Sequence, residues 1–154
     1  MNDLELALDL HQRRPGAAAP GLARGTARLL ANMGYGTLDE VSLPNGRRAD
    51  LMALNRRGQL VIVEIKSSLA DFRADDKWRD YRDCCDAFYF AVGEEFPRDA
   101  LPEDCGLIVA DDFDAVLIRE APRHGVAAGL RRRLTLRFAR IAAARLGAVM
   151  DAGR

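Results

Sequence analysis

Residues 47–68, with the sequence RRADLMALNRRGQLVIVEIKSS, place two apolar runs of strand length on either side of a short polar segment. This pattern predicts a β-hairpin. A loop of Arg56, Arg57 and Gly58 has a favoured length, because glycine readily adopts the left-handed conformation that a three-residue loop needs. The second run is rich in β-branched residues and indicates an interior strand. Glu64 and Lys66 interrupt that run, and two charges in such a strand constrain the fold strongly.

The three-residue loop determines which side chains of the hairpin face each other. Asn55 then faces Gln59, and counting outwards places Asp50 directly opposite Glu64. Directly opposed residues hold their Cβ atoms about 4.5–5.5 Å apart on one face of a sheet. Because side chains alternate along a strand, Lys66 lies on the same face as Glu64. A two-residue loop would shift Asp50 away from Glu64, so this prediction depends on the register.

Two carboxylates this close favour either a raised pKa for one of them or a bridging cation. With no His or Cys nearby, the hard oxygen donors of Asp50 and Glu64 suit Mg²⁺ or Mn²⁺. Lys66 would stabilise charge on an attacking water or on a phosphate oxygen, which suits phosphodiester hydrolysis. The alternative is a solvated Glu–Lys pair on the outer face of the sheet. Asp50 counts against it, because like charges directly across a sheet are destabilising unless something binds between them.

Lysine is rare in this chain. Of the 23 basic residues only Lys66 and Lys77 are lysine, a bias typical of a GC-rich genome. A position that retains lysine favours a role for a compact, adjustable ammonium group. Lys77 precedes Tyr81 by four residues on an expected helix, so their side chains are expected to be neighbours.

The remaining elements follow from periodicity and from turn residues. Residues 3–12 are expected to form a short helix and residues 13–21 a Pro/Gly-rich linker, followed by one domain over residues 22–150. Within the domain we expect helices at 22–33, at 73–85 with Asp71 as N-cap, and at 126–146, and strands at 38–43, 47–54, 59–67, 87–93, 105–111 and 115–121. The order α-β-β-β-α-β, with further strands and a helix, predicts an α/β (mixed α+β) fold in which helices flank a mixed sheet.

The charge is zero overall but unevenly distributed. No Asp or Glu occurs in 121–150, whereas the charged residues of 94–120 are mostly acidic. On the final helix Leu130, Leu134, Phe138 and Ile141 share one face. Its arginines either follow a DNA backbone, each meeting a phosphate, or pair with the acids of 94–120.

The expected cellular compartment follows from the sequence motifs that the chain lacks. The three cysteines form no CxxC motif, so neither a disulfide framework nor a zinc site is indicated. The start, MNDLELALDL, lacks the positive charge of a secretory signal, and no apolar run reaches the ~18 residues of a membrane span. We therefore expect a cytoplasmic protein that does not associate with membranes.

The hairpin residues resemble the PD-(D/E)xK nuclease superfamily, the restriction-endonuclease-like fold, whose pattern is Asp on one strand and Glu-x-Lys on the next. RAD supplies Asp50 and EIK supplies Glu64 and Lys66, with "AD" in place of "PD". The chain is also similar to the MmcB-like group of bacterial DNA-repair proteins, through GRRADLMAL, VIVEIKSSLADFRADDKWRDYRDCCDAFYFAV, LPEDCGLIVAD and LTLRFARIAAARL. This likeness covers nearly everything after the linker.

The resemblance implies a DNA-repair endonuclease that uses Mg²⁺ or Mn²⁺. Asp50, Glu64 and the carbonyl of Ile65 would bind the metal, and Lys66 would assist the water. Many superfamily members use a further upstream Glu, for which Glu40 is the first choice. Asp39 and Glu5 are the other options.

The expected partner is DNA, damaged or branched, in the bacterial nucleoid. A repair-protein partner and a homodimer are further expectations. The residues expected to contact DNA are Arg47, Arg48, Ser67, Lys77, Tyr81, Arg132 and Arg133. Two alternatives stay open at this point: an adaptor of the same fold that binds DNA without cleaving it, and a hydrolase for a small nucleotide.

Overall fold

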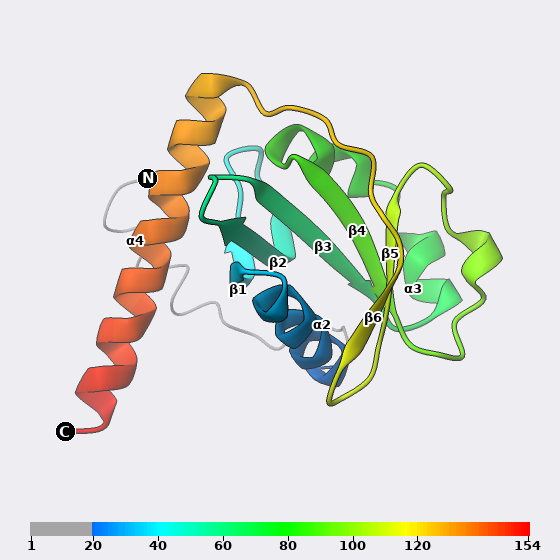
Figure 1. The fold of residues 1–154 in the computed structure, drawn as a ribbon, viewed down its shortest axis with the longest axis horizontal. Helices are drawn as coiled ribbons and strands as arrows, with labels where there is room; N and C mark the ends of the chain where they lie inside the picture. Colours follow the sequence, from blue (N-terminus) through cyan, green and yellow to red (C-terminus); the bar gives the residue numbers. More distant parts are fainter. Residues whose placement is uncertain (1–19) are drawn as a thin grey trace.

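A single six-stranded mixed sheet organises the chain, with helices on both of its faces (Figure 1). The computed structural model describes residues 20–154. The strands are β1 (Tyr35–Ser42), β2 (Arg48–Asn55), β3 (Leu60–Lys66), β4 (Ala87–Val92), β5 (Gly106–Ala110) and β6 (Ala115–Arg119). The helices are α2 (Pro20–Asn32), α3 (Leu69–Ala74) and α4 (Ala128–Ala152), with the 3₁₀ helices η1 (Trp78–Cys84) and η2 (Arg98–Ala100).

The strands lie in sequence order across the sheet. β1, β2 and β3 pair antiparallel, β3, β4 and β5 pair parallel, and β6 returns antiparallel to β5. Parallel pairing needs a crossover segment, and α3 with η1 provides it between β3 and β4. The predicted mixed sheet flanked by helices is confirmed.

The two faces of the sheet bury separate hydrophobic clusters. One face carries Ile62, Phe88 and Phe90 and is covered by η1 and α4; we call it the α4 face. The other carries Val63 and Tyr89 and is covered by α2. Because side chains alternate along β3, Glu64 and Lys66 fall on the α4 face with Ile62. The charged residues therefore share a layer with the larger aromatic core.

The first helix begins earlier than predicted. Pro20 and Gly21 were expected in the linker, but both belong to α2. Proline suits the first turn of a helix, where its missing N–H leaves no bond unmade. Gly34 ends this segment with φ +89, as predicted for a C-cap. The predicted helix at 3–12, and Glu5 within it, lie outside the described residues.

The predicted helix over 73–85 is wrong. A short helix, α3, begins at Leu69, four residues before the predicted start, with Ser68 as N-cap in place of Asp71: the Asp71 N–H donates to Ser68 Oγ over 3.1 Å. α3 ends at Ala74, and a separate 3₁₀ helix follows. The predicted common face of Trp78, Tyr81 and Cys85 is confirmed, since all three are buried in the α4-face cluster.

The C-terminal helix runs from 128 to 152, longer than predicted, and its C-terminal end extends past the sheet (Figure 1). Leu134, Phe138 and Ile141 face inward and are buried, as expected. None of the helices in residues 20–154 combines the length and hydropathy that a membrane-spanning segment needs.

Two arginines of α4 form ion pairs, but not with the acids of 94–120. Arg131 pairs with Asp86 through both terminal nitrogens, at 2.5 and 2.8 Å, and Arg145 pairs with Asp39 at 3.2 Å. Asp86 also accepts the N–H of Leu60 over 2.7 Å, so it links the final helix to the start of β3.

Candidate functional site

The hairpin register is the one that the sequence predicts. The Asn55 N–H donates to the Gln59 carbonyl over 3.2 Å, and Gly58 in the loop has φ +76. Regular pairing of β2 with β3 runs outward as far as Leu51 opposite Val63. The next pair along this register is Asp50 and Glu64.

At that pair the two strands are joined through side chains. The Asp50 N–H donates to Glu64 Oε1 over 3.1 Å, and the Ile65 N–H donates to Asp50 Oδ2 over 2.8 Å. Each carboxylate thus takes a main-chain donor of the opposite strand, so these amides remain satisfied where the ladder ends. This exchange fixes both carboxyl groups relative to each other.

Each of these carboxyl groups keeps one oxygen unused. Within residues 20–154, Asp50 Oδ1 and Glu64 Oε2 accept no hydrogen bond. Glu64 is only 4% exposed. Burial, and then the charge of Asp50, raise the pKa of Glu64 well above its ordinary 4.5. Burial also raises the pKa of Asp50, although the Ile65 N–H and Lys66 act to lower it. The pair therefore favours binding a proton or a cation.

Lys66 has a carboxylate partner that the sequence analysis missed. Its side chain is 6% exposed, and Nζ donates to Asp75 Oδ2 over 2.7 Å. Burial would lower the pKa of Lys66, but the hydrogen bond and charge of Asp75 raise it overall. Asp75 also accepts the Lys77 N–H on Oδ1, over 2.9 Å. Burial opposes a low pKa for Asp75, yet these hydrogen bonds lower it.

The sequence signal that could have identified Asp75 as the partner of Lys66 was indirect. A lysine buried in a strand needs a countercharge, and the segment after β3 offers several acids. Asp71 was the one singled out, as a helix cap. In the structure Asp71 binds Ser67 instead, accepting its N–H at 3.2 Å.

Glu40 lies beside Asp50 across the β1–β2 pair. Its neighbours pair as Asp39 with Leu51 and Val41 with Ala49, so Glu40 stands opposite Asp50. Its charge contributes to raising the pKa of Asp50. Among residues 20–154 it alone, glycine aside, has a positive φ, +49. Such left-handed backbone is unfavourable for a non-glycine residue and is often associated with function.

The backbone at Glu40 is held in place by α4. Arg145 donates to the carbonyl of Asp39 over 2.6 Å and to that of Glu40 over 3.2 Å. Glu40 Oε1 is buried and has no hydrogen-bond partner. Of the two suggested further acids that the structure describes, Glu40 is thus the one placed beside the pair, while the carboxyl group of Asp39 pairs with Arg145.

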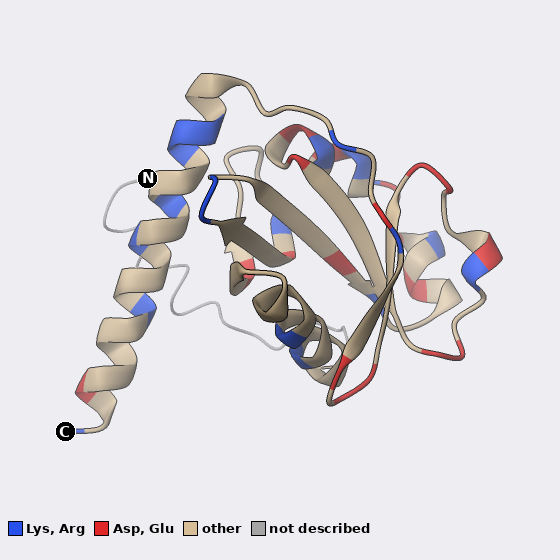
Figure 2. Cartoon of the chain, in the orientation of Figure 1, with Lys and Arg blue, Asp and Glu red and all other residues tan. Residues whose placement is uncertain are grey.

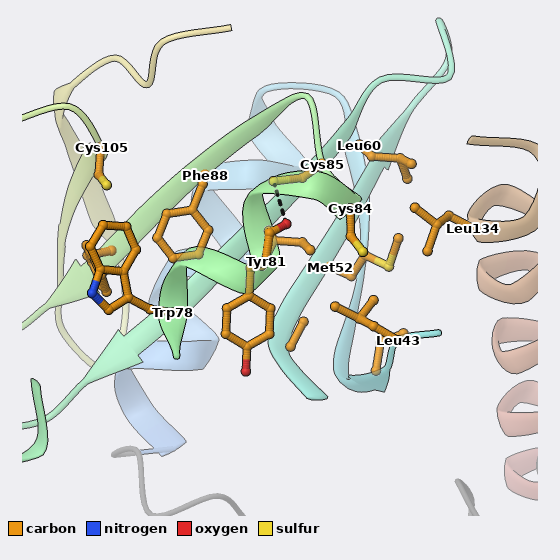
Figure 3. Close-up of a cluster of buried hydrophobic side chains, with 14 of the residues drawn as sticks. Leu43, Met52, Leu60, Trp78, Tyr81, Cys84, Cys85, Phe88, Cys105 and Leu134 are labelled. Atoms are coloured by element: carbon orange, nitrogen blue, oxygen red, sulfur yellow. Dashed lines mark hydrogen bonds between the residues drawn. The ribbon is translucent and has the colours of Figure 1, made fainter. Parts of the chain in front are cut away.

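Tyr81 forms a wall of the site from η1. Its ring stacks on Phe88 with centroids 6.1 Å apart (Figure 3), and its hydroxyl donates to the Arg48 carbonyl over 2.8 Å. Burial and then the charges of Glu64 and Asp50 raise the pKa of Tyr81. The tyrosine therefore braces the start of β2 and is a buried neighbour of the carboxylates.

The other residues expected to contact DNA do not gather at one point. Arg47 forms an ion pair with Asp80 at 2.9 Å, and Arg48, Ser67 and Lys77 are exposed at the surface. The expected proximity of Lys77 and Tyr81 assumed one α-helix, which is absent from this part of the described chain. Arg132 and Arg133 are exposed on α4. DNA contact by these residues stays a prediction.

The donor set suits a small, hard cation. In the part of the chain that the structure describes, no three His, Cys, Asp or Glu side chains are grouped closely enough to hold a metal by themselves. Mg²⁺ characteristically binds one or two carboxylates and keeps several of its waters. The unused oxygens of Asp50 and Glu64 meet that requirement, and Glu40 stands on the next strand, opposite Asp50.

Comparison with known proteins finds a matching family model and similar solved structures. A family model described as "DNA repair protein MmcB-like" matches residues 8–153. The structure is similar to that of the SPO1766 protein of unknown function from Silicibacter pomeroyi, with 41% identity, a TM-score of 0.84, and coverage of 92% of this chain and 95% of that one. No curated protein matches the chain.

A repair endonuclease from Pyrococcus abyssi is also similar, at 16% identity and a TM-score of 0.35, with 49% of this chain and 39% of that chain covered. A likeness this slight carries no argument about function.

Proposed function

Because the chain belongs to the MmcB-like family of DNA repair proteins, we propose that it is a Mg²⁺-dependent endonuclease that hydrolyses phosphodiester bonds of damaged or branched DNA. The observation that carries this proposal is the exchange of side-chain and main-chain hydrogen bonds between Asp50 and Glu64. It aligns the half-buried carboxyl group of Asp50 with the buried one of Glu64, with one oxygen of each left over, on the face that also carries Lys66.

Asp50, Glu64 and the carbonyl of Ile65 would hold the cation, with Glu40 completing the site. A cation there lowers the pKa of a bound water and offsets negative charge that develops on the phosphate. Manganese has similar preferences for oxygen donors and is the alternative ion.

Lys66 would stabilise negative charge as the phosphodiester is attacked. Its ammonium is buried and is held by Asp75, which keeps it protonated and limits its range of positions. A preorganised positive group in a site with little water stabilises charge more than a mobile one does. Tyr81 keeps β2 in register with the site through its bond to the Arg48 carbonyl.

One observation favours a second function. The positive charge of Lys66 is already balanced by Asp75 at 2.7 Å, and an ammonium so paired is less available to a phosphate. The same fold would then bind DNA, or a repair partner on DNA, without cleaving it. A homodimer is compatible with either function.

The experiment that separates these functions is a cleavage assay on nicked, branched, single-stranded and intact duplex DNA in Mg²⁺, in Mn²⁺ and in EDTA. We expect cleavage that needs the metal ion and that falls at least ~100-fold in Lys66→Ala, the usual effect of removing a group that stabilises transition-state charge.

The matched control is Arg56→Ala, which removes one positive charge from the exposed hairpin loop, outside the carboxylate pair. Cleavage that survives in the double variant Glu64→Ala, Lys66→Ala would rule out this site. Binding of DNA with no cleavage under any condition would favour the adaptor.

A further inference from the structure

The arginines of α4 divide into two sets with different surroundings. Arg131 and Arg145 point into the protein and are neutralised by Asp86 and Asp39. Figure 2 shows basic residues repeated along this helix and a single acidic residue near its C-terminal end. The outward arginines therefore have no acidic neighbour on their own helix until Asp151.

Three of the outward arginines line a groove. Arg133, Arg137 and Arg140 follow the spacing i, i+4, i+7, which brings them onto one side of the helix. With Leu136 of α4 and Pro44 of the turn after β1, they line a hollow on the protein surface. Leu136 is 54% exposed, so the groove has an apolar floor between its charges.

Two of these arginines have no countercharge. Within residues 20–154, the side chains of Arg133 and Arg137 form no ion pair and no hydrogen bond, and Arg137 Nε is buried without a partner. A buried donor without a partner costs free energy, so a protein normally pairs it with an acceptor. The groove thus holds two positive groups, one of them partly desolvated, that need an anion.

The groove lies on the same side of the sheet as the carboxylate pair. Leu134, Phe138 and Ile141 of α4 pack in the same cluster as Trp78 and Tyr81. Pro44 precedes Asp50 by six residues, so the groove begins at most ~21 Å from Asp50, because a chain cannot extend further than about 3.5 Å per residue.

The length of the groove suits a polyanion with closely spaced charges. From Arg133 to Arg140 is seven residues, or about 10 Å along the helix axis. One strand of B-DNA carries a phosphate every ~3.4 Å along its axis, so about three phosphates pass along this length. A single phosphate or carboxylate would leave part of this ~10 Å row of arginines without an anion.

We propose that the groove formed by Pro44, Arg133, Leu136, Arg137 and Arg140 binds the sugar–phosphate backbone of DNA, with Arg133 and Arg137 each neutralising one phosphate. The choice of DNA as occupant rests on the proposed function, but the site is separate from the carboxylate pair. It gives the protein affinity for DNA that is independent of sequence and does not require a metal ion.

The test is the salt dependence of DNA binding, measured by fluorescence anisotropy with a labelled 20-base-pair duplex in EDTA, between 50 and 300 mM NaCl. Each phosphate contact contributes about 0.9 to the slope of log K against log salt concentration for duplex DNA. The double variant Arg133→Ala, Arg137→Ala is expected to lose about 1.8 from the slope.

Two further variants make the result specific. Arg56→Ala, Arg57→Ala removes the same charge from the exposed hairpin loop and is expected to retain the wild-type slope. Arg133→Lys, Arg137→Lys keeps the charges and is expected to retain most of the slope, which a purely structural role for the guanidinium groups would not predict. Thermal melts check that all variants are folded.

Several results would overturn the proposal. These are an unchanged slope in the α4 double variant, an equal loss in the hairpin control, or displacement of the duplex by polyglutamate as effectively as by unlabelled DNA. Glu64→Gln separates this proposal from the nuclease: it is expected to bind the duplex in EDTA as the wild type does. DNA binding through the groove without any cleavage would leave this inference standing and would remove the proposed activity.

Discussion

Replacing Glu64 with glutamine should stabilise the protein in the absence of metal. Glutamine keeps an oxygen that can accept the Asp50 N–H, which Glu64 Oε1 accepts over 3.1 Å. It also removes the charge of a residue that is 4% exposed and lies close to a second carboxylate. A binding site for an ion is expected to contain residues that lower the stability of the protein when the ion is not bound.

The sign of the pH dependence follows from the raised pKa values. A carboxyl whose pKa is higher in the folded protein contributes stability below its ordinary pKa, and this contribution is lost as the pH rises through the folded value. The pKa of Glu64 lies well above 4.5 and that of Asp50 above 3.8. The advantage of Glu64→Gln should therefore be absent near pH 4 and should grow as the pH rises through the folded pKa of Glu64.

Once Glu64 is ionised the gain should be about 1–3 kcal/mol, because replacing a poorly compensated buried charge by a neutral group gains amounts in this range. For a chain of this size that is roughly 3–4 °C in Tm for each kcal/mol. Glu64→Ala should instead destabilise by about 1–3 kcal/mol, because it leaves the Asp50 N–H without its acceptor.

The assay is chemical or thermal unfolding of wild type and both variants in EDTA, at pH values from 4 to 8. Asp86, whose pKa is lowered, acts equally in all three proteins, so the difference reports on Glu64 and on the charged groups near it, Asp50, Lys66 and Asp75. Saturating Mg²⁺ should stabilise the wild type, by about 2.7 kcal/mol at 100 times Kd, and leave Glu64→Gln much less affected. A glutamine variant less stable than wild type at pH 8, or a difference that does not vary with pH, would refute this reasoning.

Two other predictions concern the support of the site and the packing of α2. Asp75→Asn should destabilise the protein by about 3 kcal/mol, because the Lys66 side chain, 6% exposed, loses its countercharge. In the same urea titration the substitution of the neighbouring exposed residue, Asp76→Asn, should change the free energy of unfolding by no more than ~0.5 kcal/mol. Equal effects of the two substitutions would show that Asp75 has no special part. Gly25→Ala should destabilise by about 1–3 kcal/mol, because its Cβ would lie 2.2 Å from a backbone oxygen of the β5–β6 turn. Gly147→Ala, in open space on α4, should stabilise the protein by about 0.5–1 kcal/mol. If Gly25→Ala and Gly147→Ala shifted the Tm in the same direction, this account of the packing would be contradicted.

The hairpin could be predicted because its determinants are local. Gly58 sets the loop, the loop sets the register, and alternation then brings Asp50, Glu64 and Lys66 to one face. The aromatic core of β4 and the inward face of α4 were likewise readable from periodicity. These features depend on spacing along the chain, which the sequence displays directly.

The features that were missed depend on contacts between distant segments. No Gly or Pro interrupts 69–85, so periodicity alone favours one helix there. The break comes from Asp75, whose two oxygens bind Lys66 on β3 and the N–H of Lys77. Similarly, the left-handed backbone conformation of Glu40 is supported by a hydrogen bond from Arg145, more than a hundred residues later. Such tertiary bonds override local propensity and have no signal in a single sequence.

Calorimetric titration of Mg²⁺ and of Mn²⁺ into the metal-free protein tests most directly whether Asp50 and Glu64 form a cation site. Wild type should bind the ion and Asp50→Asn should not, while the control Asp76→Asn should bind as wild type does. Equal binding by wild type and Asp50→Asn, or no binding by the wild type, would contradict the account.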